Sequence, residues 1–376
     1  MTIIVKCGIG FLNVIFFFMK CLPVQNKITY ISRQMDTTPV DFEMVKEQMI
    51  QDHPEYKHVI LAKMIHQGLF SKIGYIFHMF RQMYHIATSR AVILDTYCIP
   101  ISILKQRDSL VVIQMWHALG AFKKFGYSIL DKQEGSSSKM AKLMSMHRHY
   151  TYVLTSSVAA LPYFAEAFDV DKSKMKVYPL PKTDLLVNKA YAREIMNQIE
   201  TAYPRLRHTH KEILVYAPTF RKTHDHLKEA IEALIEQVNF TRYELVIKLH
   251  PLTKFTISDP RVIVDTKFSS LEFFYAADAI ITDYSAVLFE ACMLKKPIYF
   301  YAFDYDVYTK SRSFYIDYKA HMPGPICFTA KALISAINRR DADVQKVEDF
   351  ADLMVAPCKR SYTKDFCDFL VSSLKS

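Results

Sequence analysis

Short apolar runs alternate along the chain with segments in which apolar residues recur every three or four positions. Runs of the first kind are typical of buried strands, and the second spacing is typical of amphipathic helices. The pattern predicts strands at residues 27–32, 57–62, 91–94, 110–114, 152–155, 212–216, 243–249, 261–264, 279–282 and 297–301. It predicts helices at residues 41–51, 158–168, 185–200, 224–238, 285–294 and 361–374. Because alternating strands and helices form parallel sheets with helices on both faces, we expect an α/β protein.

The predicted strands fall into two groups, separated by the sequence Pro-Leu-Pro at residues 179–181. The chain has 376 residues, enough for two domains that each bury a full core. We therefore predict an N-terminal Rossmann-like domain at residues 26–182 and a C-terminal Rossmann-like domain at residues 183–360, facing each other across a cleft. The final helix, within residues 361–376, is expected to pack back on the first domain.

The beginning of the chain is apolar but short. Residues 7–19 carry no formal charge and lie between Lys6 and Lys20. A membrane span needs about 20 such residues, and no small-residue cleavage site of a signal peptide follows. We expect residues 1–25 to form an interfacial, membrane-associating segment, with Lys6, Lys20 and Lys27 facing acidic lipid headgroups. Residues 69–86 are a second apolar candidate, for which an ordinary core helix is at least as well supported.

Charge and cysteine content narrow the partners. The net charge is +10, and residues 1–185 hold 22 Lys and Arg against 14 Asp and Glu. A basic N-terminal half indicates an anionic partner such as acidic lipid or a phosphate polymer, and an ordinary basic surface is the alternative. We expect no nucleic-acid partner, because no binding module is recognisable. The seven cysteines show no C-x-x-C pair, which favours a reducing compartment over a disulfide scaffold.

Residues suited to phosphate chemistry follow several of the predicted strands. The carboxyl ends of parallel strands meet at one edge of a sheet, where ligands bind, and a helix start after such a strand suits phosphate. A histidine at a strand end can act as a general base, although a packing role is the alternative for each one. The pattern therefore predicts a phosphate-handling site. The residues at these strand ends are Trp116, His117, Lys123, Lys124, Pro218, Thr219, Arg221, Lys248, His250, Asp283 and Ser285, with Arg312 in a downstream loop.

Other chemistries lack their motifs. The chain has 8 glycines and contains neither G-x-G-x-x-G nor a Walker-type lysine loop nor G-x-S-x-G. Histidine pairs occur at positions 147/149, 208/210 and 224/226, but without Cys or acidic partners at zinc-site spacing, so we expect solvated surface histidines. Asp304-x-Asp306 resembles the D-x-D of metal-using sugar transferases but lies in an aromatic segment. We predict no dedicated metal site, and a need for Mg²⁺ stays open because diphosphate chemistry often recruits it.

With these motifs in this order, the chain resembles the CDP-glycerol glycerophosphotransferase family, the primases and polymerases of wall teichoic acid and related capsule polymers. The N-terminal portion looks like the short, primase-like members. The resemblance covers nearly the whole chain. Its carrying segments are residues 28–33, 114–126, 216–221, 248–251, 281–290, 296–302 and 311–317.

The resemblance implies a glycosyltransferase-B-like architecture and a peripheral, monotopic enzyme on the cytoplasmic face of the cell membrane. The family transfers glycerol phosphate from CDP-glycerol to a hydroxyl of a lipid-diphosphate-linked saccharide acceptor and releases CMP. Matching positions make His117 and His250 the catalytic histidines, and we expect His117 to be the base and His250 to contact the donor phosphates. The implied CDP-glycerol pocket comprises Pro218, Thr219, Arg221, Lys248, Asp283, Ser285, Ala286, Glu290 and Arg312. Trp116, Lys123 and Lys124 are expected on the acceptor side.

Several positions depart from the family pattern. Ala118 stands where the family usually has glycine, Ala286 replaces a second serine, Glu290 replaces aspartate and Ser313 replaces glycine. These differences leave the donor polyol open, with CDP-ribitol or another CDP-polyol as the alternative. Two different functions also stay open. One is a sugar-nucleotide glycosyltransferase or epimerase of the same fold, which would release UDP, and the other is a non-enzymatic membrane-binding protein.

Overall fold

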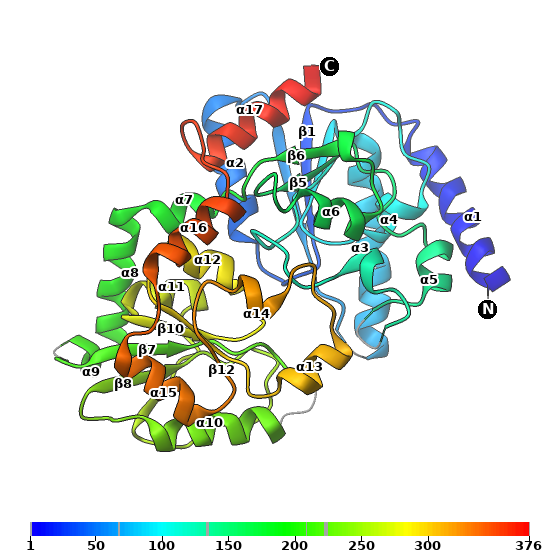
Figure 1. Ribbon diagram of the computed structural model, residues 1–376. Coiled ribbons are helices and arrows are strands. Elements are labelled where there is room, and N and C mark those ends of the chain that lie inside the picture. Colours follow the sequence, from blue (N-terminus) through cyan, green and yellow to red (C-terminus); the bar gives the residue numbers. More distant parts are fainter. Residues whose placement is uncertain (1, 67, 133–134, 208, 222–224, 376) are drawn as a thin grey trace. The chain divides into compact units, whose positions relative to one another are not determined.

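The computed structural model describes residues 2–66, 68–132, 135–207, 209–221 and 225–375. The chain divides into two compact units, coloured by sequence in Figure 1. Unit 1 comprises Met1–His117, Phe125–Asp184 and Ala356–Ser376, and unit 2 comprises Ala118–Lys124 and Leu185–Val355. Residues 118–124 therefore group with unit 2, whereas the sequence pattern assigns them to the N-terminal domain. α7 (Thr183–Val187) contains the boundary.

Unit 1 is built on a six-stranded sheet in the order β2-β1-β3-β4-β5-β6, and every neighbouring pair is parallel. All six residues of β1 are buried, as expected for a strand with helices on both faces. The strands are β1 (Lys27–Ser32), β2 (Lys57–Ala62), β3 (Ala91–Leu94), β4 (Val111–Gln114), β5 (Tyr152–Thr155) and β6 (Met175–Val177). The helices are α1 (Thr2–Met19), α2 (Val40–Asp52), α3 (Leu69–Thr88), α4 (Ile99–Ile103), α5 (Ser138–Leu143), α6 (Leu161–Phe168) and α17 (Tyr362–Lys375), with 3-10 turns at Gly126–Ile129 and Lys172–Lys174.

The last helix, α17, packs against α2 of unit 1 (Figure 1). Asp184 holds the start of α17, because its carboxylate accepts hydrogen bonds from the backbone N–H groups of Tyr362 and Thr363 at 2.8 and 2.9 Å. These N–H groups have no partner within the helix, so the carboxylate caps it.

Unit 2 has a second six-stranded parallel sheet, in the order β12-β11-β10-β7-β8-β9. A capping box between Ser269 and Glu272 begins one of its helices, α11. The strands are β7 (Glu212–Tyr216), β8 (Tyr243–Ile247), β9 (Val262–Val264), β10 (Ala279–Thr282), β11 (Ile298–Tyr301) and β12 (Ile326–Cys327). The helices are α8 (Lys189–Ala202), α9 (Pro204–Arg207), α10 (Asp225–Gln237), α11 (Ser270–Ala276), α12 (Val287–Met293), α13 (Tyr305–Ser311), α14 (Tyr318–His321), α15 (Ala330–Arg339) and α16 (Val344–Met354).

Each sheet has a point where the strand order reverses. In unit 1 the chain runs from β1 to β2 on one side and then continues from β3 on the other, so the reversal lies between β1 and β3. In unit 2 it lies between β7 and β10. Crevices beyond the carboxyl ends of strands at such points are where open α/β sheets bind ligands. We therefore expect ligand-binding groups in unit 1 at the loops after β1 and β3, and in unit 2 at the loops after β7 and β10.

The predicted α/β class with two parallel sheets is confirmed, and each predicted strand is present to within two residues. The short strands β6 and β12 were not predicted. The helix predicted at 185–200 is interrupted, because the Asn188 side chain accepts N–H bonds from Ala190 and Tyr191 and starts α8 as a new helix. The predicted helix at 224–238 is α10, and position 224 lies outside the described residues. In the described ranges, no helix combines the length and the apolar character needed to span a bilayer.

Candidate active site

His117 is held at the carboxyl end of the unit 1 sheet. Its Nδ1 lies 2.9 Å from the backbone carbonyl oxygen of Asp95, the residue after β3. A carbonyl oxygen can only accept, so Nδ1 carries the proton and Nε2 keeps its lone pair in the neutral ring. Burial lowers the pKa of His117 to about 4, with a further contribution from Lys182. The imidazole is therefore neutral near pH 7 and has the tautomer of a general base at Nε2.

Trp116 sits beside this histidine in a strained conformation. Its φ is 62°, in the left-handed region that a tryptophan rarely adopts. Its backbone N–H donates to the side-chain oxygen of Gln114 at 3.0 Å. The indole lies 4.1 Å from the His117 ring and stacks on Phe125 at 4.9 Å between centroids. Strain of this kind persists where surrounding contacts fix it, and it clusters at functional sites. Here it turns the chain so that residue 117 faces Asp95.

Two residues next to His117 were missed by the sequence analysis. Lys182 donates from Nζ to the His117 carbonyl oxygen at 3.1 Å, and its backbone N–H donates to the Asp41 carboxylate at 2.8 Å. Asp95 is buried, and burial raises its pKa to about 7. The available signal for Lys182 is its place directly after Pro179-Leu-Pro181, a sequence that also indicates a domain boundary. The sequence around Asp95 gives no signal of its role, because its backbone carbonyl, and not its side chain, holds His117.

In unit 2 the loops after β7 and β10 meet at the strand reversal. The Asp283 carboxylate accepts hydrogen bonds from the backbone N–H and the hydroxyl of Thr219, at 2.8 and 2.6 Å. The Thr282 hydroxyl donates to the Ala217 carbonyl at 2.9 Å, which ties the same two loops together. Thr219 and Asp283, both predicted site residues, are thus brought together, and Asp283 is fully buried as the organiser of this edge.

Arg221 is bound on two sides by carboxylates. It donates to Asp283 at 2.9 Å and to Asp304 at 2.7 and 3.1 Å, and only 9 % of its side chain is exposed. Its guanidinium also lies over the rings of Tyr284 and Tyr308, at 5.3 and 4.8 Å. The first aspartate of the Asp304-x-Asp306 pair is therefore an ion-pair partner in unit 2. With its charge matched in this way, Arg221 positions the loops of this edge.

Lys123 and Lys124 lie at this same edge of unit 2. The backbones of Lys123 and Phe314 form an isolated antiparallel β-bridge, and the backbone N–H of Lys124 donates to the Ser313 carbonyl at 2.9 Å. Gly120 allows this approach, since a Cβ there would lie 2.5 Å from the Phe289 ring. Burial lowers the pKa of Lys123 to about 8, with a further lowering from Arg312. The Lys123 amine lies 3.5 Å from the Tyr308 hydroxyl, and the charged groups that act on it are Arg312, Arg221 and the Asp283 carboxylate.

Lys248 and His250 lie two positions apart just after β8, and one side chain is buried while the other is exposed. Lys248 is buried, and its amine donates to the Asp265 carboxylate and the Phe268 carbonyl. His250 is exposed, and its Nδ1 accepts the backbone N–H of Leu252 at 3.2 Å. A backbone N–H can only donate, so neutral His250 carries its proton on Nε2. Its outward-facing nitrogen is thus a donor, the opposite of His117.

The other predicted residues lie along the same edge or next to it. Ser285 accepts a hydrogen bond from the Val287 N–H at 3.4 Å, and Ala286 caps α12 with no side-chain bond. α12 is shorter than predicted because Ser285 and Ala286 form the turn before it. Glu290 is buried in its first turn. Pro218 precedes Thr219, and Arg312 directly follows α13, half-buried.

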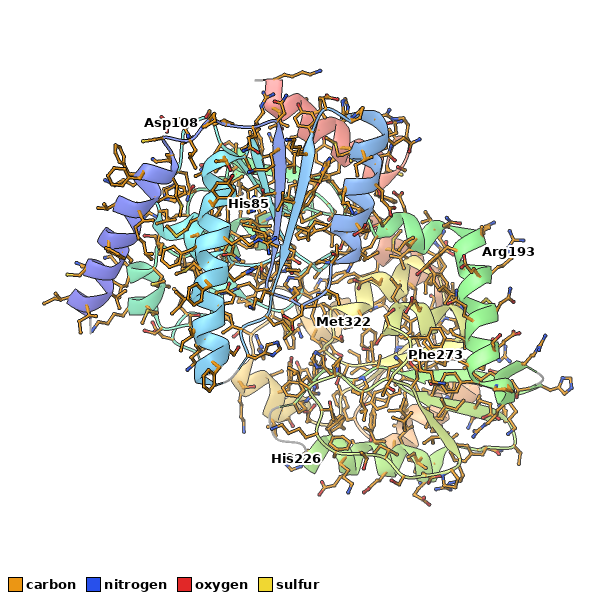
Figure 2. All side chains as sticks on the ribbon, turned by 180° about the vertical axis from the view of Figure 1, so that it is seen from behind. His85, Asp108, Arg193, His226, Phe273 and Met322 are labelled. Carbon is orange, nitrogen blue, oxygen red and sulfur yellow. The ribbon has the colours of Figure 1, made fainter. Side chains whose placement is uncertain are left out.

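No metal centre is found in the described part of the chain, where no group of three His, Cys, Asp or Glu residues could hold an ion. Of the histidine pairs, His149, His210 and His226 are exposed as predicted, and Figure 2 shows His226 on the outside of unit 2 at the start of α10. The prediction is wrong for His147, which is buried and bonded to the Tyr150 hydroxyl at 2.8 Å. His208 and His224 lie outside the described residues.

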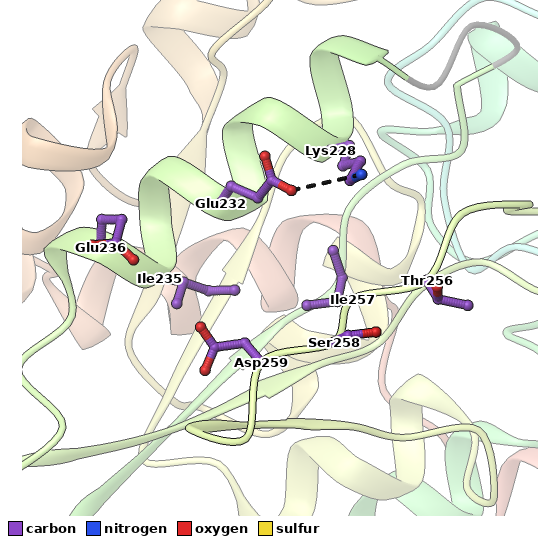
Figure 3. Close-up of a pocket in the computed structure, with 8 residues that line it drawn as sticks. All are labelled: Lys228, Glu232, Ile235, Glu236, Thr256, Ile257, Ser258 and Asp259. Atoms are coloured by element: carbon purple, nitrogen blue, oxygen red, sulfur yellow. Dashed lines mark ion pairs between the residues drawn. The ribbon is translucent and has the colours of Figure 1, made fainter.

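A cavity of about 530 Å³ in unit 2 is drawn in Figure 3. It lies between α10 and the segment Thr256–Asp259, and an ion pair of 3.8 Å joins Lys228 and Glu232 at its wall. None of the predicted site residues lines it. It is therefore separate from the predicted site.

Fold and geometry together define an α/β protein with two parallel sheets and phosphate-compatible groups at sheet edges. The family model described as CDP-glycerol:poly(glycerophosphate) glycerophosphotransferase matches residues 14–357. The chain belongs to this family, which confirms the resemblance drawn from its motifs.

Two curated relatives match nearly the full chain. The teichoic acid ribitol-phosphate primase of Bacillus spizizenii is 34% identical over 94% of this chain and 93% of its own length. The teichoic acid glycerol-phosphate primase of Bacillus subtilis is 26% identical over 93% of each chain.

Solved structures agree on the fold. The wall teichoic acid polymerase TagF superposes with a TM-score of 0.73 at 19% or 20% identity, covering 94% of this chain and 90% of that structure. The UDP-GlcNAc 2-epimerase of Neisseria meningitidis superposes with a TM-score of 0.59 at 12% identity, over 92% of this chain and 99% of that one. At these identities the structural likeness concerns architecture only.

Proposed function

We propose that this protein transfers a polyol phosphate from a CDP-polyol to a hydroxyl of a lipid-diphosphate-linked acceptor in teichoic acid synthesis, and releases CMP. The observation that carries the proposal is the pair of histidines fixed in opposite tautomers. His117 offers a lone pair at Nε2, and His250 offers an N–H at Nε2. Phosphoryl transfer to an alcohol needs one group of each kind, a base for the nucleophile and a donor for the charge on phosphate oxygens.

In the proposed step, the acceptor hydroxyl gives its proton to His117 Nε2 while its oxygen bonds to the phosphorus that carries the polyol. The bond from that phosphorus to the bridging oxygen of the diphosphate breaks, and CMP leaves with the electron pair. His250 donates from Nε2 to the donor diphosphate, and cations lower the energy of the charge that builds up on its oxygens. A neutral His117, with its pKa held near 4, is ready for this role throughout the physiological range.

Lys123 is the cation best placed to meet the donor in unit 2. Arg221 and Lys248 are matched by carboxylates, whereas Lys123 lies near Arg312 at the carboxyl edge where Thr219 and Asp283 meet. An anion placed there would relieve the repulsion between these cations. We therefore assign Lys123 to the donor diphosphate rather than to the acceptor, and Arg312 with it.

Ribitol is the polyol that the comparisons favour. The ribitol-phosphate primase is 34% identical to this chain, against 26% for the glycerol-phosphate primase, at equal coverage of the relatives' own lengths. Glycerol is the second candidate, supported by the description of the family model and by the second primase.

A panel of nucleotides tests the proposal. Purified protein is incubated with CDP-ribitol, CDP-glycerol and UDP-GlcNAc, each with a short lipid-diphosphate-linked saccharide. The proposal requires CMP and an acceptor heavier by one or more polyol phosphates, with CDP-ribitol preferred. Release of UDP, or CMP without a lengthened acceptor, would contradict it; a preference for CDP-glycerol would reverse the choice of donor.

We also propose that the protein binds the cytoplasmic face of an anionic membrane through α1 and α3. α1 leaves Phe11, Phe17 and Phe18 about two-thirds exposed, while its Phe16 is buried in unit 1. The adjacent α3 exposes Phe70 and Phe77, at 89% and 72%. The two helices pack side by side (Figure 2), and exposed apolar surface of this extent marks an interaction site. Lys6 on α1 and Lys72 on α3 are exposed cations suited to acidic headgroups.

A further inference from the structure

Arg33 lies at the strand reversal of the unit 1 sheet. It directly follows β1, and its backbone N–H donates to the Thr96 hydroxyl at 3.2 Å, across the reversal. Its guanidinium lies over the Tyr97 ring at 5.4 Å. Asp95 in turn holds the His117 ring. Three consecutive residues after β3 therefore fix both the proposed base and an arginine at the same sheet edge.

The positive charge of Arg33 is not matched within the described part of the chain. No carboxylate there forms an ion pair with it, in contrast to Arg221, which has Asp283 and Asp304. The groups around the guanidinium are uncharged near pH 7, namely Tyr75, Tyr97, Cys98, His147 and Tyr150. A half-buried cation without an ion-pair partner attracts an anion, because no opposite charge neutralises it.

Several polar atoms beside Arg33 are buried without a hydrogen bond in the described structure. They are Nε of Arg33 itself, the hydroxyl of Tyr75, both amide atoms of Gln82 and the hydroxyl of Ser102. These groups face one another: Tyr75 lies within hydrogen-bonding reach of Gln82 and Arg33, and Tyr97 lies within hydrogen-bonding reach of Ser102. Each unsatisfied buried group costs about 1–3 kcal/mol, so their gathering at one place needs an explanation. We call Arg33, Tyr75, Gln82 and Ser102 the Arg33 cluster.

The cluster lies beneath the helix that we assign to the membrane. Tyr75 and Gln82 are seven residues apart on α3, hence on one face, and both are buried where α3 packs on β1 and α4. Phe70 and Phe77 are also seven apart, and they form the exposed face of the same helix. α3 therefore presents apolar rings on its exposed face and the polar groups of Tyr75 and Gln82 on its buried face.

We propose that the Arg33 cluster binds the diphosphate of the lipid-linked acceptor and so delivers the acceptor hydroxyl toward His117. The inference rests on the proposed function and adds to it the residues that recognise the acceptor. A guanidinium pairs with two phosphate oxygens at once, which favours arginine over lysine at this position. The Tyr75 hydroxyl and the Gln82 amide N–H group are donors for the remaining oxygens.

The test compares two acceptors, a saccharide on a short alkyl diphosphate and the same saccharide without phosphate. Wild-type protein should have a KM about 10- to 100-fold lower for the diphosphate form, the range expected from charge-assisted hydrogen bonds. Arg33→Met should reduce this preference to less than about threefold and leave the KM for the CDP-polyol unchanged. Arg148→Met, which removes an exposed arginine of the same unit, should keep the preference.

Tyr75→Phe provides a second test in case Arg33→Met does not fold. It deletes a hydroxyl that makes no well-formed hydrogen bond and lies only within reach of Gln82 and Arg33, so the protein should still fold with little change in thermal stability, while the KM for the diphosphate acceptor should rise severalfold. A diphosphate preference retained by folded Arg33→Met, or by Arg33→Lys and Tyr75→Phe together, would overturn the inference and leave the proposed function standing. Competition by vesicles of plain anionic phospholipid as effective as the diphosphate acceptor would assign the cluster to ordinary headgroups and also overturn it. Wild-type protein that transfers to neither acceptor would overturn the proposed function itself.

Discussion

The His117 ring donates from Nδ1 to the backbone carbonyl of Asp95 over 2.9 Å, and this one bond decides which nitrogen can take a proton. Because the partner is a main-chain oxygen, no ionisation of Asp95 can reverse the tautomer. The neighbouring Trp116, strained at φ 62°, directs the ring to that carbonyl. The sheet edge thus fixes the proposed base before any substrate is present, in line with the preorganisation that catalysis requires.

Replacing His117 by Ala should lower kcat by about 100- to 10,000-fold, the usual contribution of a positioned general base. The affinity for the CDP-polyol, measured by calorimetry, should stay within about twofold of wild type, since the donor is assigned to unit 2. Lost donor binding with residual turnover intact would reverse the roles of the two histidines.

His250→Ala should affect the donor side. Removing the Nε2 donor is expected to lower kcat/KM for the CDP-polyol by about 10- to 100-fold. His250→Gln, which offers an N–H at a similar reach, should recover part of the loss because the role requires a donor rather than a base. An equally inactive Gln variant would indicate that His250 acts by proton transfer.

Asp283→Asn should destabilise unit 2. The carboxylate neutralises Arg221 and accepts two bonds from Thr219, so breaking the pair costs about 3–5 kcal/mol of unfolding free energy, the range for buried ion pairs. Urea unfolding followed by circular dichroism measures this loss. Asp306→Asn, at an exposed position in the same region, is the matched control and should change stability by less than about 0.5 kcal/mol. Equal effects of both variants would contradict the assignment of Asp283.

The pH dependence should reveal Lys123. Its pKa of about 8 means that it is charged below pH 8 and loses its attraction for the donor diphosphate above it. We therefore expect kcat/KM for the CDP-polyol to fall as the pH rises through about 8. Lys123→Arg should move that fall to higher pH, because a guanidinium stays protonated. An unshifted alkaline limb in this variant would remove Lys123 from the donor site.

Membrane binding should depend on the exposed rings of α1. Phe17→Ser combined with Phe18→Ser is expected to weaken sedimentation with anionic vesicles by at least about tenfold, given about 1.5–3 kcal/mol for burying each ring. Leu353→Ser, an exposed apolar residue on α16 of unit 2, serves as the control and should not alter binding. Comparable losses in both variants, or wild-type protein that remains in the supernatant, would contradict the proposed membrane face.

The sequence was sufficient for the fold class because hydrophobic periodicity reports which face of each element is buried. Strands such as β3 and β10 are buried throughout, and their sequences, Ala-Val-Ile-Leu and Ala-Ile-Ile-Thr, are almost entirely apolar. The short strands β6 and β12 are too brief to leave a signal, and the break at Asn188 depends on a side-chain cap that periodicity does not register.

The site was predictable to the extent that its residues follow strands. Thr219 and Asp283 were both selected for that reason, and they are bonded to each other. The surroundings of Arg221, Lys248 and His147 could not be read in the same way, because burial and ion pairing arise from segments distant in the chain. Asp95 and Arg33 were missed for a related reason. Asp95 acts through its backbone carbonyl, which any residue would provide. Arg33 is of interest because no carboxylate of the described structure forms an ion pair with it, and a sequence does not show the absence of a partner.

The most direct test of the central claim follows the phosphorus atom that carries the polyol. A CDP-polyol labelled at that phosphorus is mixed with the lipid-linked acceptor and with wild-type protein in a single turnover. The account predicts that the label appears in the lengthened acceptor, that the released nucleotide is unlabelled CMP, and that His117→Ala slows the formation of both by about 100- to 10,000-fold. Label released as CDP would show that the polyol alone was transferred, and it would contradict a phosphotransfer mechanism.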